Sequence, residues 1–229
     1  SRFSKINEPP KQLIKLNKKS LLENQLTYLI NSNIKNFIFP LGYKKKYFID
    51  FFKKKKIINK FKLKIHHDKI NNLDENKVNI LLFDAGKKSS KLKRIKDSTE
   101  YFKNKYFLVT YGDGIANINF YKYTKMFEKN KKAIVASKCV NSQYGHFKIK
   151  GNKIISFKEK PILENPINIG YYFFTRDIFN NFYKRNFELE DKFMQSLIKN
   201  KKIITYNHNG FFFNIDRKKD LDYIKKKYK

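Results

Sequence analysis

The sequence is poor in the features that would place a protein outside the cell or in a membrane. It has one cysteine, Cys139, which cannot form an internal disulfide bond and suits a reducing cytoplasm. It contains no run of about 18 apolar residues, so no membrane span is expected. The opening residues SRFSKINEPPKQLIK lack the apolar core of a signal peptide. We therefore expect a cytoplasmic protein without a membrane span.

Acidic residues are also scarce. The chain has 20 Asp and Glu against 52 Lys and Arg, which gives a formal net charge of +32 at pH 7. Such an excess favours nucleic acids or acidic membrane surfaces, but a nucleic-acid binder usually gathers its charge in one patch. Here the lysines are spread over the whole length, and the other frequent residues share AT-rich codons with Lys. We interpret the charge as base bias on solvated faces and expect no specific nucleic acid partner; a basic nucleic-acid binder is the alternative.

What is present indicates one α/β domain. The chain has 229 residues, 41% of them hydrophobic, which is enough for a substantial core. Over roughly the first 140 residues, segments with helical spacing, such as 20–33, alternate with short apolar runs, such as 36–42 and 78–86. This alternation predicts βαβ units and a largely parallel sheet. Because no linker or repeat is visible, residues 1–229 are predicted to form a single domain.

A β-hairpin is predicted in the second half of the chain. Two alternating runs in YGHFKIKGNKIISFKEKP meet at Gly151 and Asn152, a pair typical of hairpin turns. We expect an antiparallel insertion, a flap over residues 145–157, that covers one end of the sheet.

The most strand-like segment, YFLVTYGDG, ends at a lone carboxylate. Asp113 lies between Gly112 and Gly114, which allow a tight backbone and close approach by a ligand. In open α/β sheets, ligands bind beyond the carboxyl ends of parallel strands. A carboxylate there can hold Mg²⁺, which takes one or two carboxylates together with substrate phosphates. The alternative is a simple turn aspartate, because Asp-Gly is a common turn dipeptide.

Five segments together resemble the motifs of one enzyme family. In chain order they are SRFSKINEPPKQLIKL, YGDG, FKEKP, INIGYYFF and GFFFNIDRKKDLDYI. The order and spacing resemble the sugar-1-phosphate nucleotidyltransferases, in particular their glucose-1-phosphate cytidylyltransferase branch, over nearly the whole chain. The resemblance implies a Rossmann-like fold of the nucleotide-diphospho-sugar transferase type, with a mixed, mainly parallel sheet and helices on both sides. It also implies the substrates, a nucleoside triphosphate and a sugar 1-phosphate, and the products, a nucleoside-diphosphate sugar for surface polysaccharide and pyrophosphate.

The resemblance assigns the charged residues to phosphate and metal. Arg2 and Lys11 match residues that contact the nucleotide phosphates, and Lys160 matches a lysine on the sugar phosphate. Asp113 and Asp216 match the two aspartates that hold Mg²⁺, the implied cofactor. Charged groups of this kind are what nucleotidyl transfer needs, because two anionic reactants must be aligned while charge develops on phosphate oxygens.

A second group of residues is implied to contact the sugar and the base. Its members are small or polar: Ser89, Ser90, Gly112, Gly145, Glu159, Asn168 and Gly170. Plainer interpretations remain for several assigned residues. Lys11 and Lys160 could be solvated surface lysines, Glu159 an exposed hairpin residue, and Asp216 a helix cap.

The sequence departs from the family pattern at three places. The family's first strand, which would be central in the sheet, and its Gly-rich phosphate loop are not in this sequence, and we expect the natural chain to begin earlier. SSKLKR stands in place of T-G-G-R-L-K-R, so that Ser89 and Ser90 replace glycines. Gln12 and Arg217 each replace the last residue of a motif, in P-K-P and M-D-T respectively.

Three alternatives to a glucose-1-phosphate cytidylyltransferase therefore stay open. One keeps the fold with another sugar phosphate or base, as in a heptose or mannose 1-phosphate guanylyltransferase. Another is a degenerate, non-catalytic member that binds a nucleotide sugar. The third is the basic nucleic-acid binder. The sequence also leaves open whether the chain forms a homo-oligomer.

Overall fold

The computed structural model describes residues 8–16, 18–54, 63–66, 77–127, 131–180, 187–215 and 220. The helical segments are η1 Lys11–Leu13, α1 Leu21–Asn31, α2 Lys45–Lys53, α4 Lys91–Ser98, η2 Thr99–Tyr101, α5 Phe120–Lys125, η3 Arg176–Phe179, η4 Leu189–Phe193 and α6 Met194–Lys199. The strands are β1 Lys15–Leu16, β2 Lys19–Ser20, β3 Asn36–Leu41, β4 Leu63–His66, β5 Val78–Asp84, β6 Tyr106–Thr110, β7 Gly114–Ala116, β8 Ala133–Lys138, β9 His146–Lys150, β10 Lys153–Lys158, β11 Ile167–Thr175, β12 Ile203–Asn207 and β13 Phe212–Asn214.

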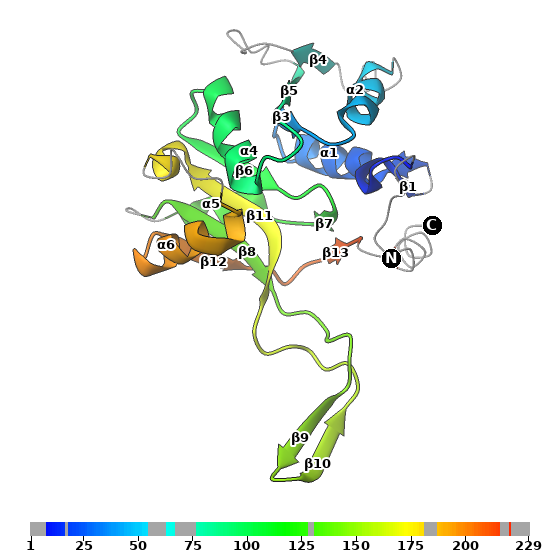
Figure 1. Ribbon diagram of the computed structural model, residues 1–229, viewed down its shortest axis with the longest axis vertical. Helices are drawn as coiled ribbons and strands as arrows, with labels where there is room; N and C mark the ends of the chain where they lie inside the picture. Colours follow the sequence, from blue (N-terminus) through cyan, green and yellow to red (C-terminus); the bar gives the residue numbers. More distant parts are fainter. Residues whose placement is uncertain are drawn as a thin grey trace.

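Two sheets carry the body of the molecule (Figure 1). In the first, β3 and β4 flank β5 and both run parallel to it. The second has the order β12-β8-β11-β6, with β12 parallel to β8 and with β11 antiparallel to both of its neighbours. The antiparallel pairs of these two sheets therefore all involve β11. The predicted mixed, mainly parallel α/β architecture is confirmed.

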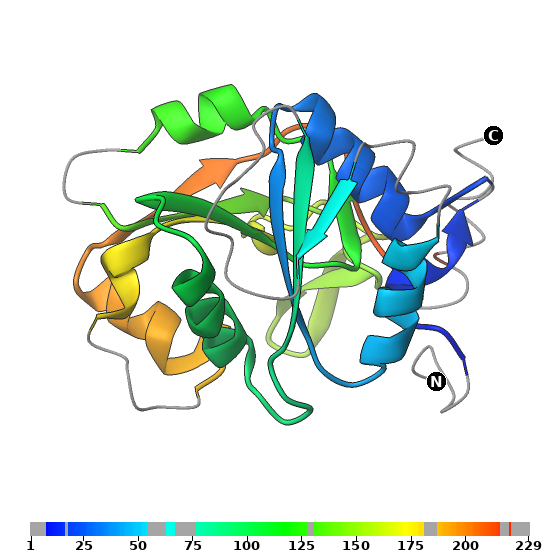
Figure 2. The same ribbon diagram turned by 90° about the horizontal axis from the view of Figure 1, so that it is seen from above.

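Helices cover both faces of the second sheet because the side chains of β11 alternate (Figure 2). Tyr171 and Phe173 pack on one face with Tyr123 of α5. Tyr172 and Phe174 point the other way, into a cluster with α4, η4 and α6. The run INIGYYFFT is apolar on both faces for this reason, as expected of a strand buried between two layers of helix.

Helix α1 begins where its sequence predicts. Ser20 is the N-cap: its hydroxyl accepts a hydrogen bond from Glu23 N at 3.1 Å, and Glu23 Oε2 accepts from Ser20 N at 2.7 Å, a complete capping box. Leu22, Leu26 and Leu29 lie one helical turn apart and pack against β3 and β5. The prediction of a helix over 20–33 is confirmed.

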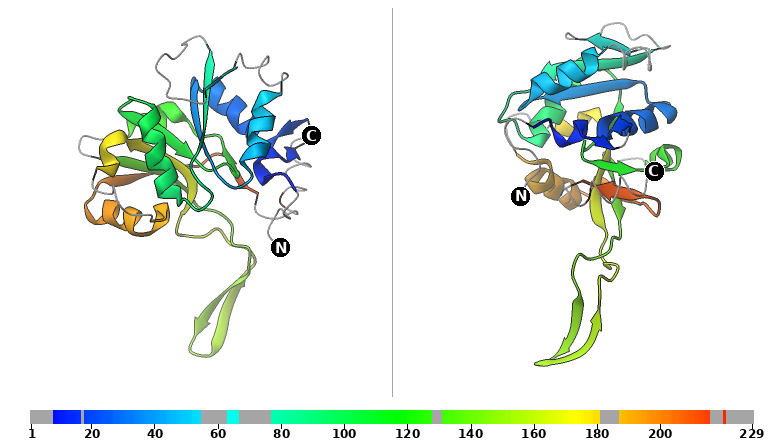
Figure 3. Two further views of the ribbon diagram at one scale, coloured as in Figure 1. Left: turned by 45° about the horizontal axis from the view of Figure 1, so that its top comes forward. Right: turned by 90° about the vertical axis from the view of Figure 1, so that its right-hand side faces the viewer.

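The predicted hairpin is present as β9 and β10, with Gly151 in the turn at φ +57°. Its expected position is wrong. All residues of β9 and β10 are exposed, and the hairpin projects away from the body instead of covering an end of the sheet (Figure 3). Two extended segments, 139–145 and 159–166, connect it to β8 and β11 and carry it outward. We call β9, β10 and these two segments the ribbon.

Within the described residues, no helix is long and apolar enough to cross a membrane.

Candidate active site

Helix α1 holds the turn that carries Asp113 through hydrogen bonds from the side chain of Gln25. Gln25 has only 4% of its surface exposed, a rare position for an amide side chain. Its Nε2 donates to the carbonyl oxygens of Tyr111 at 2.8 Å and Gly114 at 3.1 Å, and lies 3.2 Å from the hydroxyl of Thr110. These bonds satisfy the carbonyl oxygens of Tyr111 and Gly114, the residues at the two ends of the turn. The YGDG turn is therefore held by a residue that the sequence analysis did not single out.

Asp113 meets the end of β13 and Lys11. Lys11 Nζ lies 2.8 Å from Asp113 Oδ2 and donates to the carbonyl oxygen of Ile215 at 3.2 Å. The backbone of Ile215 in turn donates to the carbonyl oxygen of Asp113 at 3.0 Å, continuing the pairing of β7 with β13. The side chains of Lys11 and Asp113 are 24% and 29% exposed, so both are open to solvent. Two segments matched by the resemblance, 102 residues apart at Asp113 and Ile215, thus lie side by side.

Two assigned residues cannot be placed. Asp216 directly follows Ile215, and Arg2 precedes the first described residue; both lie outside the described residues. The pairing of Asp113 with Asp216 stays a prediction. In the described part of the chain, no three His, Cys, Asp or Glu side chains gather as a metal site.

Gly112 is needed for its small size. A Cβ at this position would lie 2.9 Å from Cγ of Gln12, closer than packed carbon atoms approach. Gln12 is the residue that replaces the second proline of P-K-P, and it covers the backbone of the YGDG turn. The close approach expected at Gly112 is made here by the protein itself.

Asn168 and Gly170 form a bend in β11. Asn168 Oδ1 accepts a hydrogen bond from Gly170 N at 2.9 Å, and the register between β11 and β8 shifts at this point. Gly170 has φ +77°, and a Cβ there would lie 2.7 Å from Cδ2 of Tyr111. A glycine is therefore required both by the backbone and by the neighbouring ring. The N-x-G motif contacts the YGDG turn through Tyr111.

A polar network extends from this bend. Asn168 Nδ2 donates to the Tyr172 hydroxyl, which lies 3.2 Å from that of Tyr111. Tyr111 donates to Glu190, and Lys91 Nζ lies 2.5 Å from Glu190 Oε1. The network joins the ends of β6 and β11 to the first turns of α4 and η4. Tyr111 is the residue between its strand and Gly112, a position that could have drawn attention to it.

Burial and hydrogen bonding shift the pKa values of Tyr111 and Glu190 in this network. Burial raises the pKa of Tyr111, and its hydrogen bond to Glu190 raises it further, so Tyr111 is the donor. Burial also acts to raise the pKa of Glu190, but hydrogen bonds from Lys91 and Tyr111 outweigh it and hold that pKa below its ordinary value. Glu190 is thus an ionised acceptor between a cation and a phenol.

The hydroxyl groups of Ser89 and Ser90 make hydrogen bonds to the backbone close to them in sequence. Ser90 is the N-cap of α4 and accepts from Lys93 N at 3.2 Å, while the Ser89 hydroxyl donates to the carbonyl oxygen of Ala85. Arg94 braces the same loop with hydrogen bonds to the carbonyl oxygens of Gly86 at 2.8 Å and Pro40 at 3.0 Å. The predicted contact of these serines with a base stays a prediction.

Gly145, Glu159 and Lys160 lie on the ribbon. A Cβ on Gly145 would overlap the ring of Phe157 and come within 2.9 Å of Glu159 Oε2, so the two ends of the hairpin touch here. Lys160 Nζ lies 3.1 Å from Glu159 Oε1, and both side chains are 60% exposed. These residues directly adjoin β9 and β10, which stand away from β7 and β13 (Figure 1). The structure brings them together with each other, and not with the Asp113 turn.

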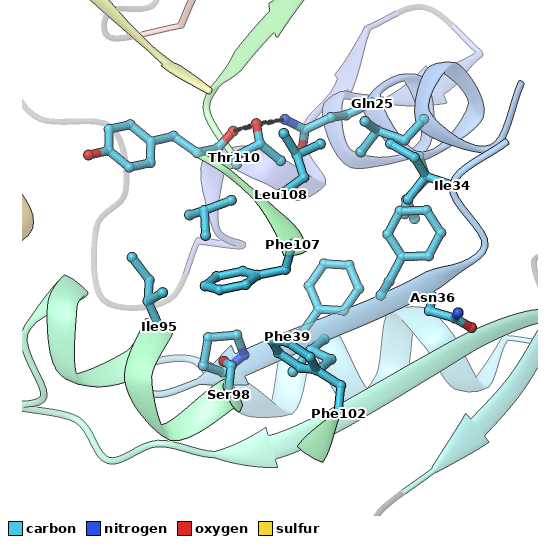
Figure 4. Close-up of a pocket in the computed structure, with 18 of the residues that line it drawn as sticks. Gln25, Ile34, Asn36, Phe39, Ile95, Ser98, Phe102, Phe107, Leu108 and Thr110 are labelled. Carbon is cyan, nitrogen blue, oxygen red and sulfur yellow. Dashed lines mark hydrogen bonds between the residues drawn. The ribbon is translucent and has the colours of Figure 1, made fainter. Parts of the chain in front are cut away.

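A large groove separates the two sheets. About 1960 Å³ in volume, it runs between β3 and β6, each of which is the edge strand of its sheet (Figure 4). Its walls are mainly apolar and include Phe39, Phe107 and Leu108. Gly112 and Asp113 line it as well, so the groove reaches the YGDG turn.

Comparisons with known proteins agree with this arrangement. A family model described as nucleotidyl transferase matches residues 6–215. The probable glucose-1-phosphate cytidylyltransferase of Bacillus subtilis is 28% identical over 96% of this chain and 89% of its own length. The glucose-1-phosphate cytidylyltransferase of Salmonella typhimurium is 26% identical over 94% of this chain and 86% of its own length. The crystal structure of HddC from Yersinia pseudotuberculosis superposes with a TM-score of 0.71 at 19% identity, covering 96% of this chain and 90% of HddC, and so has the same fold.

Proposed function

Because the chain belongs to the nucleotidyl transferase family, we propose that it joins a nucleoside triphosphate to a sugar 1-phosphate. The products are a nucleoside-diphosphate sugar and pyrophosphate, and the activity is that of a glucose-1-phosphate cytidylyltransferase. The observation that carries this proposal is the junction of Lys11, Asp113 and the end of β13 at 2.8 to 3.2 Å. The motifs matched at the start, middle and end of the chain meet there.

In this reaction a phosphate oxygen of the sugar phosphate attacks the α-phosphorus of the triphosphate, and pyrophosphate leaves. The protein contributes position and charge more than covalent chemistry. Lys11, anchored by Ile215 and Asp113, places a cation at the strand ends, where it neutralises charge on phosphate oxygens. Arg2 and Lys160 are proposed to do the same for the nucleotide and the sugar phosphate.

The residues at this junction fit Mg²⁺. Asp113 offers a partly exposed carboxylate, and the carbonyl oxygen of Ile215 contacts the same Lys11 Nζ as that carboxylate. Hard oxygen donors of this kind are those that Mg²⁺ binds. Asp113 would hold the ion together with Asp216, the next residue after Ile215. When bound, Mg²⁺ would supply positive charge to the reacting phosphates, and Lys11 would neutralise charge on a phosphate oxygen.

The sugar side of the site is proposed to use residues from two places. Asn168 and Gly170 line it from β11, and Gly145, Glu159 and Lys160 reach it from the ribbon. Ser89 and Ser90 are proposed to approach the base from the loop before α4, and Gly112 to leave room beside the phosphates. The hydrogen-bonded bend at Asn168 supports this assignment because it presents the β11 backbone next to the YGDG turn.

The groove between β3 and β6 is relevant to the prediction that residues 1–229 form a single domain, because it separates the two sheets. Neither of these two strands has a partner on its groove side among the described residues. We propose that the groove takes the strand that the resemblance places ahead of the Arg2 motif. Such a strand would join both sheets and end beside Gly112, where a Gly-rich loop would reach the phosphates.

A pyrophosphate-release screen tests the proposed function. The natural full-length chain is incubated with Mg²⁺, each of the common nucleoside triphosphates and a panel of sugar 1-phosphates that includes glucose, mannose and heptose phosphates. We expect release to require one triphosphate and one sugar phosphate together, with CTP and glucose 1-phosphate as the best pair. Release with another pair identifies the alternative substrates, and a folded protein that releases nothing with any pair is a non-catalytic member.

A further inference from the structure

The polar network beside the YGDG turn is a chain of hydrogen bonds that ends at a charged acceptor. Glu190 Oε1 contacts both Lys91 Nζ, at 2.5 Å, and the hydroxyl of Tyr111. Lys91 also lies over the ring of Tyr111, with Nζ 4.9 Å from the ring centroid. A carboxylate that is paired with a lysine only accepts hydrogen bonds, so the hydroxyl proton of Tyr111 points to Glu190. Lys91 thus holds the acceptor in place, and the acceptor fixes the direction of the Tyr111 hydroxyl.

The direction of this first bond determines the other bonds up to the bend in β11. Because the single hydroxyl proton of Tyr111 is donated to Glu190, the Tyr172 hydroxyl, 3.2 Å away, donates to the oxygen of Tyr111. The oxygen of Tyr172 in turn accepts from Nδ2 of Asn168. With its amide nitrogen on Tyr172, Asn168 presents Oδ1 to the backbone N–H of Gly170 at 2.9 Å. The acceptor at Glu190 therefore selects the amide orientation that closes the bend.

The opposite amide orientation is incompatible with the bend. A flipped Asn168 would direct its Nδ2 donor at the N–H of Gly170, and two donors form no hydrogen bond. Gly170 has φ +77°, and its carbonyl oxygen accepts from the backbone N–H of Tyr111 at 3.0 Å. The backbone bond to Tyr111 forms with either amide orientation of Asn168. The bond from Gly170 N to Asn168 Oδ1 forms with one orientation only, so it depends on the acceptor at the other end of the chain of bonds.

We propose that Glu190 is a positioning residue for the sugar 1-phosphate. This inference rests on the proposed function, in which Asn168 and Gly170 line the sugar side of the site. Glu190 itself does not contact the substrate, and it acts on the bend through the hydroxyl groups of Tyr111 and Tyr172. A bend that is held in one orientation before the sugar arrives spares the cost of ordering these groups during binding.

The nucleotide side of the site is held by other contacts. Gln25 Nε2 donates to the carbonyl oxygens at both ends of the YGDG turn. The loop before α4 is held by its N-cap, Ser90, and by the hydrogen bonds of Arg94 to backbone carbonyl oxygens. These bonds do not involve Glu190. Loss of the Glu190 acceptor should therefore weaken binding of the sugar phosphate and leave binding of the triphosphate unchanged.

Steady-state kinetics of the natural full-length chain test this role, with pyrophosphate release as the signal. Glu190→Ala removes the acceptor, and we expect the KM for the sugar 1-phosphate to rise at least about tenfold while the KM for the triphosphate changes less than about twofold and kcat less than about threefold. Glu190→Gln should recover most of the lost affinity, because Lys91 and Tyr111 contact the same atom, Oε1, and glutamine offers an oxygen there. Asp97→Ala is the matched control and should leave both KM values within about twofold. Asp97 is 31% exposed against 36% for Glu190, and it pairs with Lys93 on its own helix.

A double-mutant cycle tests whether Glu190 acts through the hydroxyl groups. Tyr172→Phe interrupts the chain of bonds between Glu190 and Asn168, so its addition to Glu190→Ala should raise the KM for the sugar phosphate little further. Melting curves show which variants are folded at the assay temperature, and the Glu190 variants alone decide if Tyr172→Phe is not. Four results overturn the proposal: additive effects in the cycle, equal rises in both KM values, an unchanged KM in Glu190→Ala, or a Glu190→Gln protein as impaired as Glu190→Ala.

Failure of the proposed function gives a different result, an unmodified chain that releases no pyrophosphate with any pair of substrates. Calorimetric titration with each sugar 1-phosphate of the panel then tests the same role for Glu190. Binding that is at least about tenfold weaker in Glu190→Ala than in the unmodified chain supports the proposal. Equal binding by the two proteins, or no binding by either, overturns it.

Discussion

The two halves of the candidate site are held in place by different means. At the body half, Lys11, Asp113 and Ile215 are joined by an ion pair and backbone hydrogen bonds, and Gln25 fixes the turn from a buried position. At the ribbon half, Glu159 and Lys160 contact each other in solvent at 60% exposure. Residues at the ends of sheet strands are thus positioned by the fold itself. The described contacts of Gly145, Glu159 and Lys160 are made within the ribbon.

The largest expected effect tests whether Asp113 takes part in catalysis or only in an ion pair with Lys11. Asp113→Asn should lower kcat by about 100-fold or more, because it removes charge from the reacting centre. The melting temperature should change little, since the side chain is partly exposed and the turn is held by Gln25. Asp177→Asn is the control, because Asp177, on η3, also pairs with a lysine, Lys132 at 2.5 Å, and is not among the assigned site residues. The measurement is pyrophosphate release under saturating substrates.

Near-normal turnover of Asp113→Asn in the full-length chain would show that Asp113 is a turn residue without a catalytic role. The two halves of the candidate site would then differ in their contacts but not in any measured contribution to catalysis.

The body half was also the more predictable half from sequence. Asp113 ends an apolar run between two glycines, so its place at the edge of the sheet follows from local pattern. The hairpin was equally visible in the alternation around Gly151. Its direction was not, because a flap and a projecting ribbon have the same alternation and differ in tertiary contacts. Gln25 and Glu190 were missed because a single polar residue in a helix carries no signal until its partners are known.

The next effect concerns the groove beside the body half. A designed extension ahead of Ser1, made of six alternating Val and Ile residues and a Gly-rich loop, should raise the melting temperature by about 5 °C or more. The reason is burial of several apolar side chains against the walls that include Phe39 and Leu108, together with hydrogen bonds to both edges. The control replaces every second residue of the extension by proline, which cannot donate to a neighbouring strand.

Equal melting temperatures for the two extensions would show that the groove does not accept a strand. A gain seen with the alternating extension alone would support the proposed single domain.

A pair of glycine substitutions compares the two regions directly. Gly170→Ala should destabilise the protein by about 2–3 kcal/mol, since φ is +77° and the added Cβ meets the ring of Tyr111. Gly151→Ala in the ribbon should cost about 1 kcal/mol, because φ is +57° but the Cβ meets nothing within 4 Å. Urea denaturation followed by circular dichroism measures both. Equal losses would mean that the contact with Tyr111 contributes nothing.

The smallest expected effect compares two Glu–Lys pairs across pH. Glu190 pairs with Lys91 at 36% and 48% exposure, whereas Glu159 and Lys160 are each 60% exposed. Hydrogen bonds hold the pKa of Glu190 below its ordinary value of 4.5 against the effect of burial. A carboxyl whose pKa is lower in the folded state stabilises the protein above the unfolded value, and this stabilisation is lost as pH falls through the folded value.

The unmodified protein should therefore melt above Glu190→Gln at pH 6 to 7, and the difference should shrink as the pH falls below 4.5 toward the folded value. The effect is modest because both partners are partly exposed and solvent screens them. Glu159→Gln serves as the comparison and should leave the melting temperature unchanged at pH 7, because an exposed pair contributes little. Melting curves at half-unit steps of pH decide the matter. A constant difference for Glu190→Gln at every pH would show that its hydrogen bonds to Tyr111 and Lys91 stabilise the network without depending on its charge.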